Sequence, residues 1–127
     1  MSRKPEPMTN PITNRGTAFT RAERLEHGMI GRLPAAVETL EQQAQRCYRQ
    51  LQGLGCNIDR YVFLEELQNR NETLYYKLLV DHLVELLPVI YDPTVGEAIK
   101  KWSHAYRRSR AVYLSVDHIE DVRPSFE

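Results

Sequence analysis

The feature that most constrains the fold is a wide apolar stripe between residues 72 and 87. Its apolar side chains recur at intervals of three and four, as on one face of a helix: Leu74, Tyr75, Leu78, Leu79, Leu83, Leu86 and Leu87. A stripe of this width is typical of a central core helix. Asn71 suits the N-cap, and Pro88 predicts the end, because the residue before a proline avoids helical backbone angles. We therefore expect the chain to fold around a helix over residues 72–87.

Four further segments have helical patterns. Residues 20–23 form a capping-box sequence that predicts a short helix over 21–27. Residues 39–52 place Leu40, Ala44, Cys47, Tyr48 and Leu51 on one face. A third helix is expected from a cap at Asn57 or Asp59 to about residue 68, and Asp92 followed by Pro93 predicts a fifth, over residues 93–107.

Two segments are expected to be extended. Residues 89–91 are short and apolar, and residues 111–116 alternate in the manner of one strand. A lone strand leaves its backbone groups unpaired, so this strand is expected to need partners outside the chain. The polar, proline-containing residues 1–14 are expected to form a flexible arm, and residues 15–127 one domain. The predicted fold class is mainly α, with about five helices and one short strand.

Composition narrows the function classes. The chain has 17 basic and 17 acidic residues, which argues against electrostatic capture of nucleic acid or of an anionic membrane. No apolar run approaches the roughly 18 residues of a membrane span. Cys47 and Cys56 form neither a CxxC pair nor a disulfide framework, so reduced thiols in a cytoplasmic protein are expected.

The sequence gives little support for a metal-binding or nucleotide-binding site. His82 with Glu85, or Glu97 with His104, would supply two ligands, whereas zinc requires three or four protein ligands. The glycines around Leu54 do not make a GxGxxG loop, because Ile58 takes the third glycine position. No metal site and no cofactor site is therefore expected within this chain.

Tyr91 is the most interesting single residue. It precedes a capped helix start, where free backbone N–H groups favour anions, so its phenol could pass a proton to a bound carboxylate substrate. A packed tyrosine is the alternative. The basic residues Arg107, Arg108 and Arg110 suit a solvated helix end or a subunit salt-bridge site more than an anion site.

Six motif blocks, in order, resemble the N-terminal part of malic enzymes. They are NRGTAFT at 14–20, GRLP at 31–34, VET at 37–39, QNRNETLYY at 68–76, LPVIYDPTVG at 87–96 and YRR at 106–108. The resemblance implies an oxidoreductase that decarboxylates L-malate to pyruvate and CO2, with NAD or NADP and Mg²⁺ or Mn²⁺. It implies that Tyr91 is the general acid that protonates the enol of pyruvate, and that the protein is a homo-oligomer, either a dimer or a tetramer.

Family members are several times longer. Their catalytic lysine, metal-binding carboxylates and nucleotide domain match positions beyond Glu127. We therefore expect this chain to be a truncated N-terminal helical domain that is inactive alone. Departures from the family pattern include Asp92, which still suits a helix cap, and Ser109 and Ala111, which relax the turn between the arginine pair and the expected strand.

Some animal members of the family bind fumarate at a dimer interface with two arginines and a glutamate. The matching residues here are Glu38, Arg46 and Arg70, and the alternative is an interface or structural salt bridge. A non-enzymatic reading is a free-standing assembly or regulatory module that docks on a full-length malic enzyme. Such a module would use the stripe of helix 39–52 and the Arg46/Arg70 pair. A bare helical adaptor is weaker still.

Overall fold

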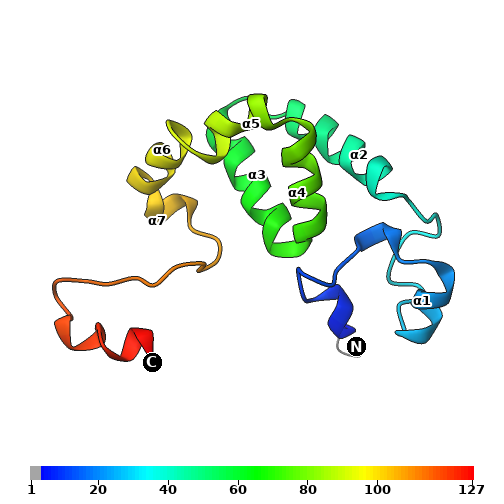
Figure 1. Ribbon diagram of the computed structural model, residues 1–127, viewed down its shortest axis with the longest axis horizontal. Helices are drawn as coiled ribbons and strands as arrows, with labels where there is room; N and C mark the ends of the chain where they lie inside the picture. Colours follow the sequence, from blue (N-terminus) through cyan, green and yellow to red (C-terminus); the bar gives the residue numbers. More distant parts are fainter. Residues whose placement is uncertain (1–3) are drawn as a thin grey trace.

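The computed structural model describes residues 4–127 and is mainly helical (Figure 1). Seven α-helices lie within that range: α1 Arg21–Glu26, α2 Leu40–Gln52, α3 Asn57–Arg70, α4 Glu72–Asp81, α5 Leu83–Ile90, α6 Thr94–Lys100 and α7 Trp102–Ala105. Short 3-10 helices span Glu6–Met8, Gly16–Ala18, Ile119–Asp121 and Pro124–Phe126. No strand occurs among the described residues, and none of their helices is long and apolar enough to cross a membrane.

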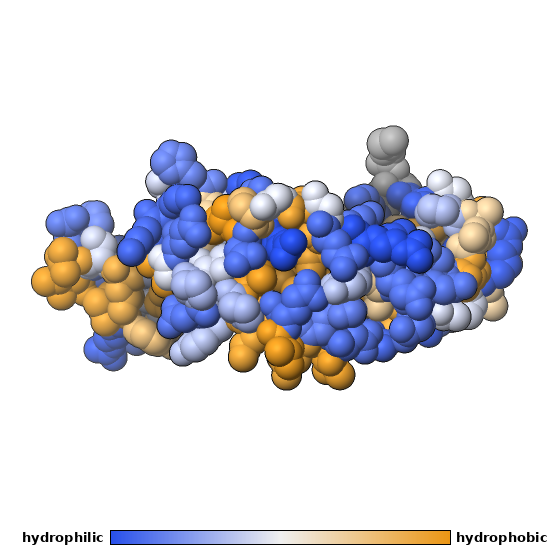
Figure 2. Space-filling model, turned by 90° about the horizontal axis from the view of Figure 1, so that it is seen from above, coloured by the Kyte–Doolittle hydropathy of each residue, from blue (hydrophilic) through white to orange (hydrophobic). Residues whose placement is uncertain are grey.

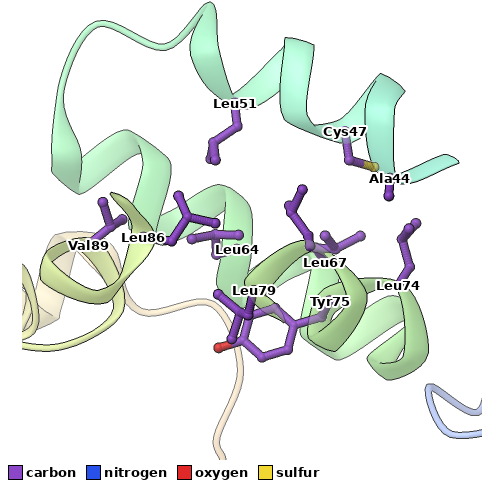
Figure 3. Close-up of a cluster of buried hydrophobic side chains, with 11 residues drawn as sticks. Ala44, Cys47, Leu51, Leu64, Leu67, Leu74, Tyr75, Leu79, Leu86 and Val89 are labelled. Carbon is purple, nitrogen blue, oxygen red and sulfur yellow. The ribbon is translucent and has the colours of Figure 1, made fainter. Parts of the chain in front are cut away.

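The core lies where α2, α3, α4 and α5 meet. Figure 1 shows α3 and α4 side by side at the centre of the molecule, with α2 next to them and α6 and α7 at the opposite end from α1. Leucines dominate the buried cluster (Figure 3), whose members are Ala44, Cys47, Leu51, Leu64, Leu67, Leu74, Tyr75, Leu78, Leu79, Leu86 and Val89. Burial of these apolar side chains is the main force that holds the four helices together.

The apolar stripe predicted on residues 39–52 is confirmed, and it is buried in this core. Ala44, Cys47 and Leu51 are each at most 3% exposed, and Leu40 and Tyr48 pack against the cluster. A face that is already buried within the chain cannot also dock on a partner. The part of the module hypothesis that used this stripe is therefore wrong.

The predicted helix over residues 72–87 is two helices, and Pro88 does not end the second. α4 stops at Asp81, and α5 continues through Pro88 to Ile90, so Val89 and Ile90 are helical rather than extended. Leu86 and Val89 are at most 2% exposed, and their burial offsets the one backbone hydrogen bond that a proline removes.

The break between α4 and α5 falls at His82 and is supported from α2. The Tyr48 ring stacks on the His82 ring with centroids 3.6 Å apart and planes 3° apart. The Tyr48 hydroxyl also donates a hydrogen bond to Glu85 over 2.5 Å. Both contacts join residues more than thirty positions apart, so the local pattern around His82 contains no sign of them.

The third and fifth helices differ from expectation mainly at their ends. Cys56, rather than Asn57 or Asp59, is the N-cap of α3, and that helix extends to Arg70. The expected helix over 93–107 is divided at Lys101 into α6 and α7. Pro93 takes the N-cap position of α6 without a side-chain capping bond, so the capping role predicted for Asp92 is wrong.

Residues 111–116 form no strand in the structure. They are exposed and lack regular hydrogen bonding, and no neighbouring strand within the described chain is available to pair with them. The expected strand is therefore absent from the described chain, and its need for partners outside the chain stays a prediction. At the other end, the Pro11 carbonyl accepts a hydrogen bond from the Glu72 N–H over 2.9 Å, which attaches the N-terminal segment to the start of α4.

Two predicted helix caps are confirmed, and a second capping box appears. Thr20 and Glu23 form the expected box on α1, and Asn71 accepts from the Leu74 N–H at the start of α4. Thr39 and Gln42 form a further box on α2. These side chains satisfy N–H groups that a helix leaves unpaired at its first turn.

We expect Thr39→Ala to lower the free energy of unfolding by about 1 kcal/mol, because it removes the acceptor for the Gln42 N–H at the start of a core helix. Thr39→Ser keeps the hydroxyl and should stay close to the unsubstituted chain. Urea unfolding followed by circular dichroism measures both variants. Equal destabilisation by alanine and serine would show that the cap contributes nothing.

Candidate functional site

Glu38 and Arg46, which the motif blocks singled out, form a two-pronged ion pair. Arg46 Nη2 lies 2.6 Å from Glu38 Oε2, and Arg46 Nε lies 3.2 Å from Oε1. The Thr17 hydroxyl donates to the same carboxylate, and it also accepts from Arg46 Nη2 over 3.3 Å. Paired N–H donors on a carboxylate fix its orientation, so the Arg46 guanidinium is held in one direction.

These contacts shift the pKa values of both Glu38 and Arg46. Hydrogen bonds from Arg46 first and Thr17 second lower the pKa of Glu38 below its ordinary value of 4.5, against a smaller opposing effect of burial. The hydrogen bond to Glu38 raises the pKa of Arg46. Both groups are therefore charged at neutral pH.

Arg70 lies at the end of α3 and shares a pocket with Arg46. This arginine pocket has a volume of about 230 Å³, and its lining includes Thr17, Gln43, Arg46, Gln50, Arg70 and Asn71. Within residues 4–127 the Arg70 guanidinium has no ion pair, whereas Arg46 is held by Glu38. The structure thus brings together the two predicted arginines, with Glu38 behind Arg46, in a pocket suited to an anion.

A third arginine, which the sequence did not reveal, holds the chain segments behind this pocket. Arg24 is 4% exposed and donates to five backbone carbonyls: Phe19 at 2.7 Å, Pro34 at 2.6 Å, Ala35 at 3.3 Å, Thr17 at 3.0 Å and Ala36 at 3.1 Å. Glu38 donates its own N–H to the Thr17 carbonyl over 3.1 Å. Arg24 therefore joins the segments that carry Thr17 and Glu38.

No local signal distinguishes Arg24 from the exposed arginine at the start of the same helix. An arginine in a short, polar helix is expected to point to solvent. Its burial depends on the connector at residues 34–36, which curves back over α1 and presents its carbonyls. The pattern that would have found it is an arginine near a segment rich in unpaired carbonyls, and only the fold shows that.

Tyr91 lies apart from the arginine pocket, at the junction of α5 and α6. The Tyr91 side chain is 65% exposed. Its backbone is fixed by two hydrogen bonds of 2.9 Å: the Tyr91 N–H donates to the Leu87 carbonyl, and the Tyr91 carbonyl accepts from the Val95 N–H. Within the described chain its hydroxyl has no hydrogen-bond partner. The backbone of Tyr91 is therefore fixed, while its phenol is available to contact a group outside the described residues.

The basic residues after α7 pair within the chain. Arg110 lies 3.3 Å from Glu72 and donates to the Asn69 side chain over 3.0 Å, and Arg107 lies 3.5 Å from Glu66. These exposed contacts attach the C-terminal segment to α3 and α4. They agree with a salt-bridge role more than with an anion site.

Surface apolar residues gather on α4 and α5. Val80, Leu83, Val84 and Leu87 are each at least half exposed, and Figure 2 shows apolar side chains protruding from the middle of the molecule.

Among residues 4–127, no group of three His, Cys, Asp or Glu side chains is placed to hold a metal ion. The described residues therefore do not fit a resident metal.

The Glu38–Arg46 pair predicts a pH dependence. Because the folded pKa of Glu38 is lowered, the pair stabilises the fold above pH 4.5, and this contribution is lost as the pH falls further through the folded pKa. Glu38→Gln should remove that part of the acid sensitivity, whereas Glu26→Gln, at an exposed position on α1, should not. Urea midpoints at neutral pH and below pH 4.5 measure it, and parallel curves for Glu38→Gln and the unsubstituted chain would contradict it.

Comparison with known proteins shows which proteins the chain is similar to. Residues 68–127 match the family model described as malic enzyme, N-terminal domain. Over these residues the chain is similar to the N-terminal part of malic enzymes, and the resemblance inferred from the six motif blocks is confirmed.

Three relatives illustrate the similarity. An NAD-dependent malic enzyme of Sodalis glossinidius is 49% identical over 115 residues, which are 88% of this chain and 20% of the relative. The NAD-dependent malic enzyme of Aeromonas hydrophila is 45% identical over 121 residues, which are 93% of this chain and 22% of the relative. NAD-dependent malic enzyme 3 of Bacillus subtilis is 45% identical over 122 residues, which are 96% of this chain and 22% of the relative. The chain therefore spans about a fifth of the length of these relatives.

Proposed function

We propose that this chain serves an enzyme that oxidises and decarboxylates L-malate to pyruvate and CO2 with NAD⁺ and a divalent metal ion. The observation that carries the proposal is the 45–49% identity to NAD-dependent malic enzymes over most of the chain. Their names favour NAD over NADP, a choice that the sequence left open. A metal bound elsewhere would polarise the 2-oxo group. The described residues do not fit that metal, so no step through it is assigned to them.

Tyr91 is the residue of this chain that we assign to the chemistry. Its role is to donate a proton from the phenol to the enol of pyruvate after CO2 has left. The exposure of its side chain, its held backbone and its unpaired hydroxyl support this role. Phenols in water titrate near pH 10, so efficient transfer near neutral pH requires a cationic group from outside the described residues.

The arginine pocket is assigned to a dicarboxylate effector such as fumarate. Arg70 has no ion pair within the described range, and Glu38 orients Arg46, so two guanidinium groups are available to one small dianion. The alternative is that the two arginines form salt bridges across a subunit interface. A dimer or tetramer is part of the proposal, and the exposed apolar residues of α4 and α5 support contact with other protein surfaces. The proposed location is the cytoplasm.

The function is tested with a chimaera. This chain replaces the matched 122 residues of the Bacillus subtilis enzyme, and malate-dependent NADH production is followed in the chimaera and in the purified 127-residue chain. The chimaera should be active and the chain alone inactive. A folded but inactive chimaera, or an active isolated chain, would contradict the proposal.

The second candidate is a separate assembly or regulatory module. The exposed apolar residues of α4 and α5 are the observation that favours it, since the stripe of α2 is buried. Light scattering of the chain with an intact malic enzyme separates the two. Stable hetero-association supports the module, and its absence leaves the enzyme-portion proposal.

A further inference from the structure

A small cavity lies between α3 and the chain that runs from α6 to Arg108. It has a volume of about 20 Å³, which is room for one particle of the size of a water molecule. Its lining includes Tyr61 and Glu65 of α3, Trp102 of α7, and the two arginines Arg107 and Arg108. We call it the Glu65 cavity. It shares no lining residue with the arginine pocket, so it is a separate feature of the molecule.

Glu65 brings to this cavity a carboxylate that has no partner. Its side chain is partly buried, and within residues 4–127 it forms no ion pair and no hydrogen bond. Burial raises the pKa of Glu65 above its ordinary value of 4.5, and the charge of Arg110 opposes this with a smaller effect. A carboxylate that is withdrawn from water is normally compensated by a cation or by hydrogen-bond donors. The unpaired carboxylate therefore points to a bound cation.

The arginines around the cavity are directed at other acceptors. Arg107 lies 3.5 Å from Glu66, and Arg110 lies 3.3 Å from Glu72. Arg108 donates to a backbone carbonyl of α3 over 3.5 Å. None of the three forms an ion pair with the carboxylate of the cavity, so that negative charge remains available to a cation from outside the chain.

Aromatic rings supply the second part of the site. Tyr61 and Trp102 line the cavity. The Trp102 ring packs against two further rings, with centroids 5.4 Å from that of Tyr106 and 5.5 Å from that of Tyr113. The face of an aromatic ring is negative and attracts cations, and the face of tryptophan attracts them most strongly. A carboxylate beside such rings suits an ammonium group, which donates an N–H to the carboxylate and presents its remaining charge to the rings.

We propose that the Glu65 cavity binds the ammonium head of a small primary amine. The ammonium donates a hydrogen bond to the Glu65 carboxylate and lies against the rings of Tyr61 and Trp102. A head of this size matches the volume of the cavity, whereas a quaternary ammonium with four methyl groups exceeds it. The site is independent of the proposed function, because it uses neither Tyr91 nor the arginine pocket.

The test uses the fluorescence of Trp102, which is the single tryptophan of the chain and lines the cavity. The purified 127-residue chain is titrated with methylammonium chloride, and sodium chloride at the same ionic strength is the reference. We expect a saturable change of fluorescence with methylammonium and none with sodium. Tetramethylammonium, which is too large for the cavity, should also give no saturable change.

Two variants with the same change of charge locate the site. Glu65→Gln keeps the shape of the side chain but removes its charge, so it should weaken methylammonium binding by about tenfold or more. Glu97→Gln is the matched control, because it removes a charge from an exposed position on α6 that does not line the cavity. A second readout is the urea midpoint. Methylammonium should raise it in the unsubstituted chain and in Glu97→Gln but not in Glu65→Gln, because a ligand stabilises the folded state that binds it.

Three results would overturn the proposal: no saturable change with methylammonium, equal binding by Glu65→Gln, or equal binding of tetramethylammonium. The first would show that water or a nearby arginine is enough for the carboxylate. The third would show that cations bind to the outer surface of the rings instead of the cavity. None of these measurements uses malate, so failure here leaves the proposed enzyme function standing, and an inactive chimaera leaves the ammonium site standing.

Discussion

Replacing Arg24 with methionine is expected to lower the free energy of unfolding by about 3–5 kcal/mol, the loss typical of removing one side of a buried charged interaction. Methionine fills much of the same volume but donates no hydrogen bond, so five backbone carbonyls lose the guanidinium donor together, although that of Thr17 keeps the Glu38 N–H. Three of these carbonyls belong to residues 34–36, which lie in a connector without helix or strand to pair them. Urea unfolding by circular dichroism measures the loss.

The matched control is Arg21→Met, which removes an exposed arginine from the same helix and should change stability by less than about 0.5 kcal/mol. Arg24→Lys separates charge from geometry. Lysine keeps the charge, but it has three donors on one nitrogen instead of a planar fork, so it should fall between the arginine and methionine forms. Equal stability of Arg24→Met and Arg21→Met would show that water replaces the guanidinium without cost.

What could be predicted from the sequence is local. The capping box at Thr20, the Asn71 cap and the buried face of α2 all depend on residues within one or two helical turns, and all are confirmed. Such signals come from backbone N–H groups and side-chain spacing, which operate before any tertiary contact forms.

What could not be predicted depends on distant contacts. The end of α4 at Asp81 is accompanied by the stacking of Tyr48 on His82, and helix through Pro88 is accompanied by burial of Leu86 and Val89. In both cases tertiary packing overrides a local preference. The expected strand over 111–116 failed for the opposite reason, because a strand preference without a neighbouring strand leaves the backbone in solvent.

The candidate site divides in the same way. The motif blocks located Glu38, Arg46 and Arg70, and the structure brings Glu38 to Arg46 and both arginines to one pocket. The buried Arg24 could not be found in this way, because a buried polar side chain is recognisable only when its surroundings are known.

Tyr91→Phe, introduced into the chimaera with the Bacillus subtilis enzyme, is expected to lower kcat for malate oxidation by about a hundredfold to ten-thousandfold, the usual contribution of a general acid. The KM for malate should change by only a few fold, because in the proposed role the phenol acts after CO2 has left. The fold should persist, since the side chain is 65% exposed and its hydroxyl has no partner within the described chain.

A second readout tests the proton itself. Microscopic reversibility requires the group that protonates the enol to remove the same proton from pyruvate in the reverse direction, so exchange of the pyruvate methyl protons with D₂O should fall in proportion to kcat. Tyr106→Phe is the control, because that tyrosine is 47% exposed and follows α7 rather than joining α5 to α6. If Tyr91→Phe lowered kcat but left the exchange intact, the tyrosine would act elsewhere in the reaction, and its assignment as general acid would be wrong.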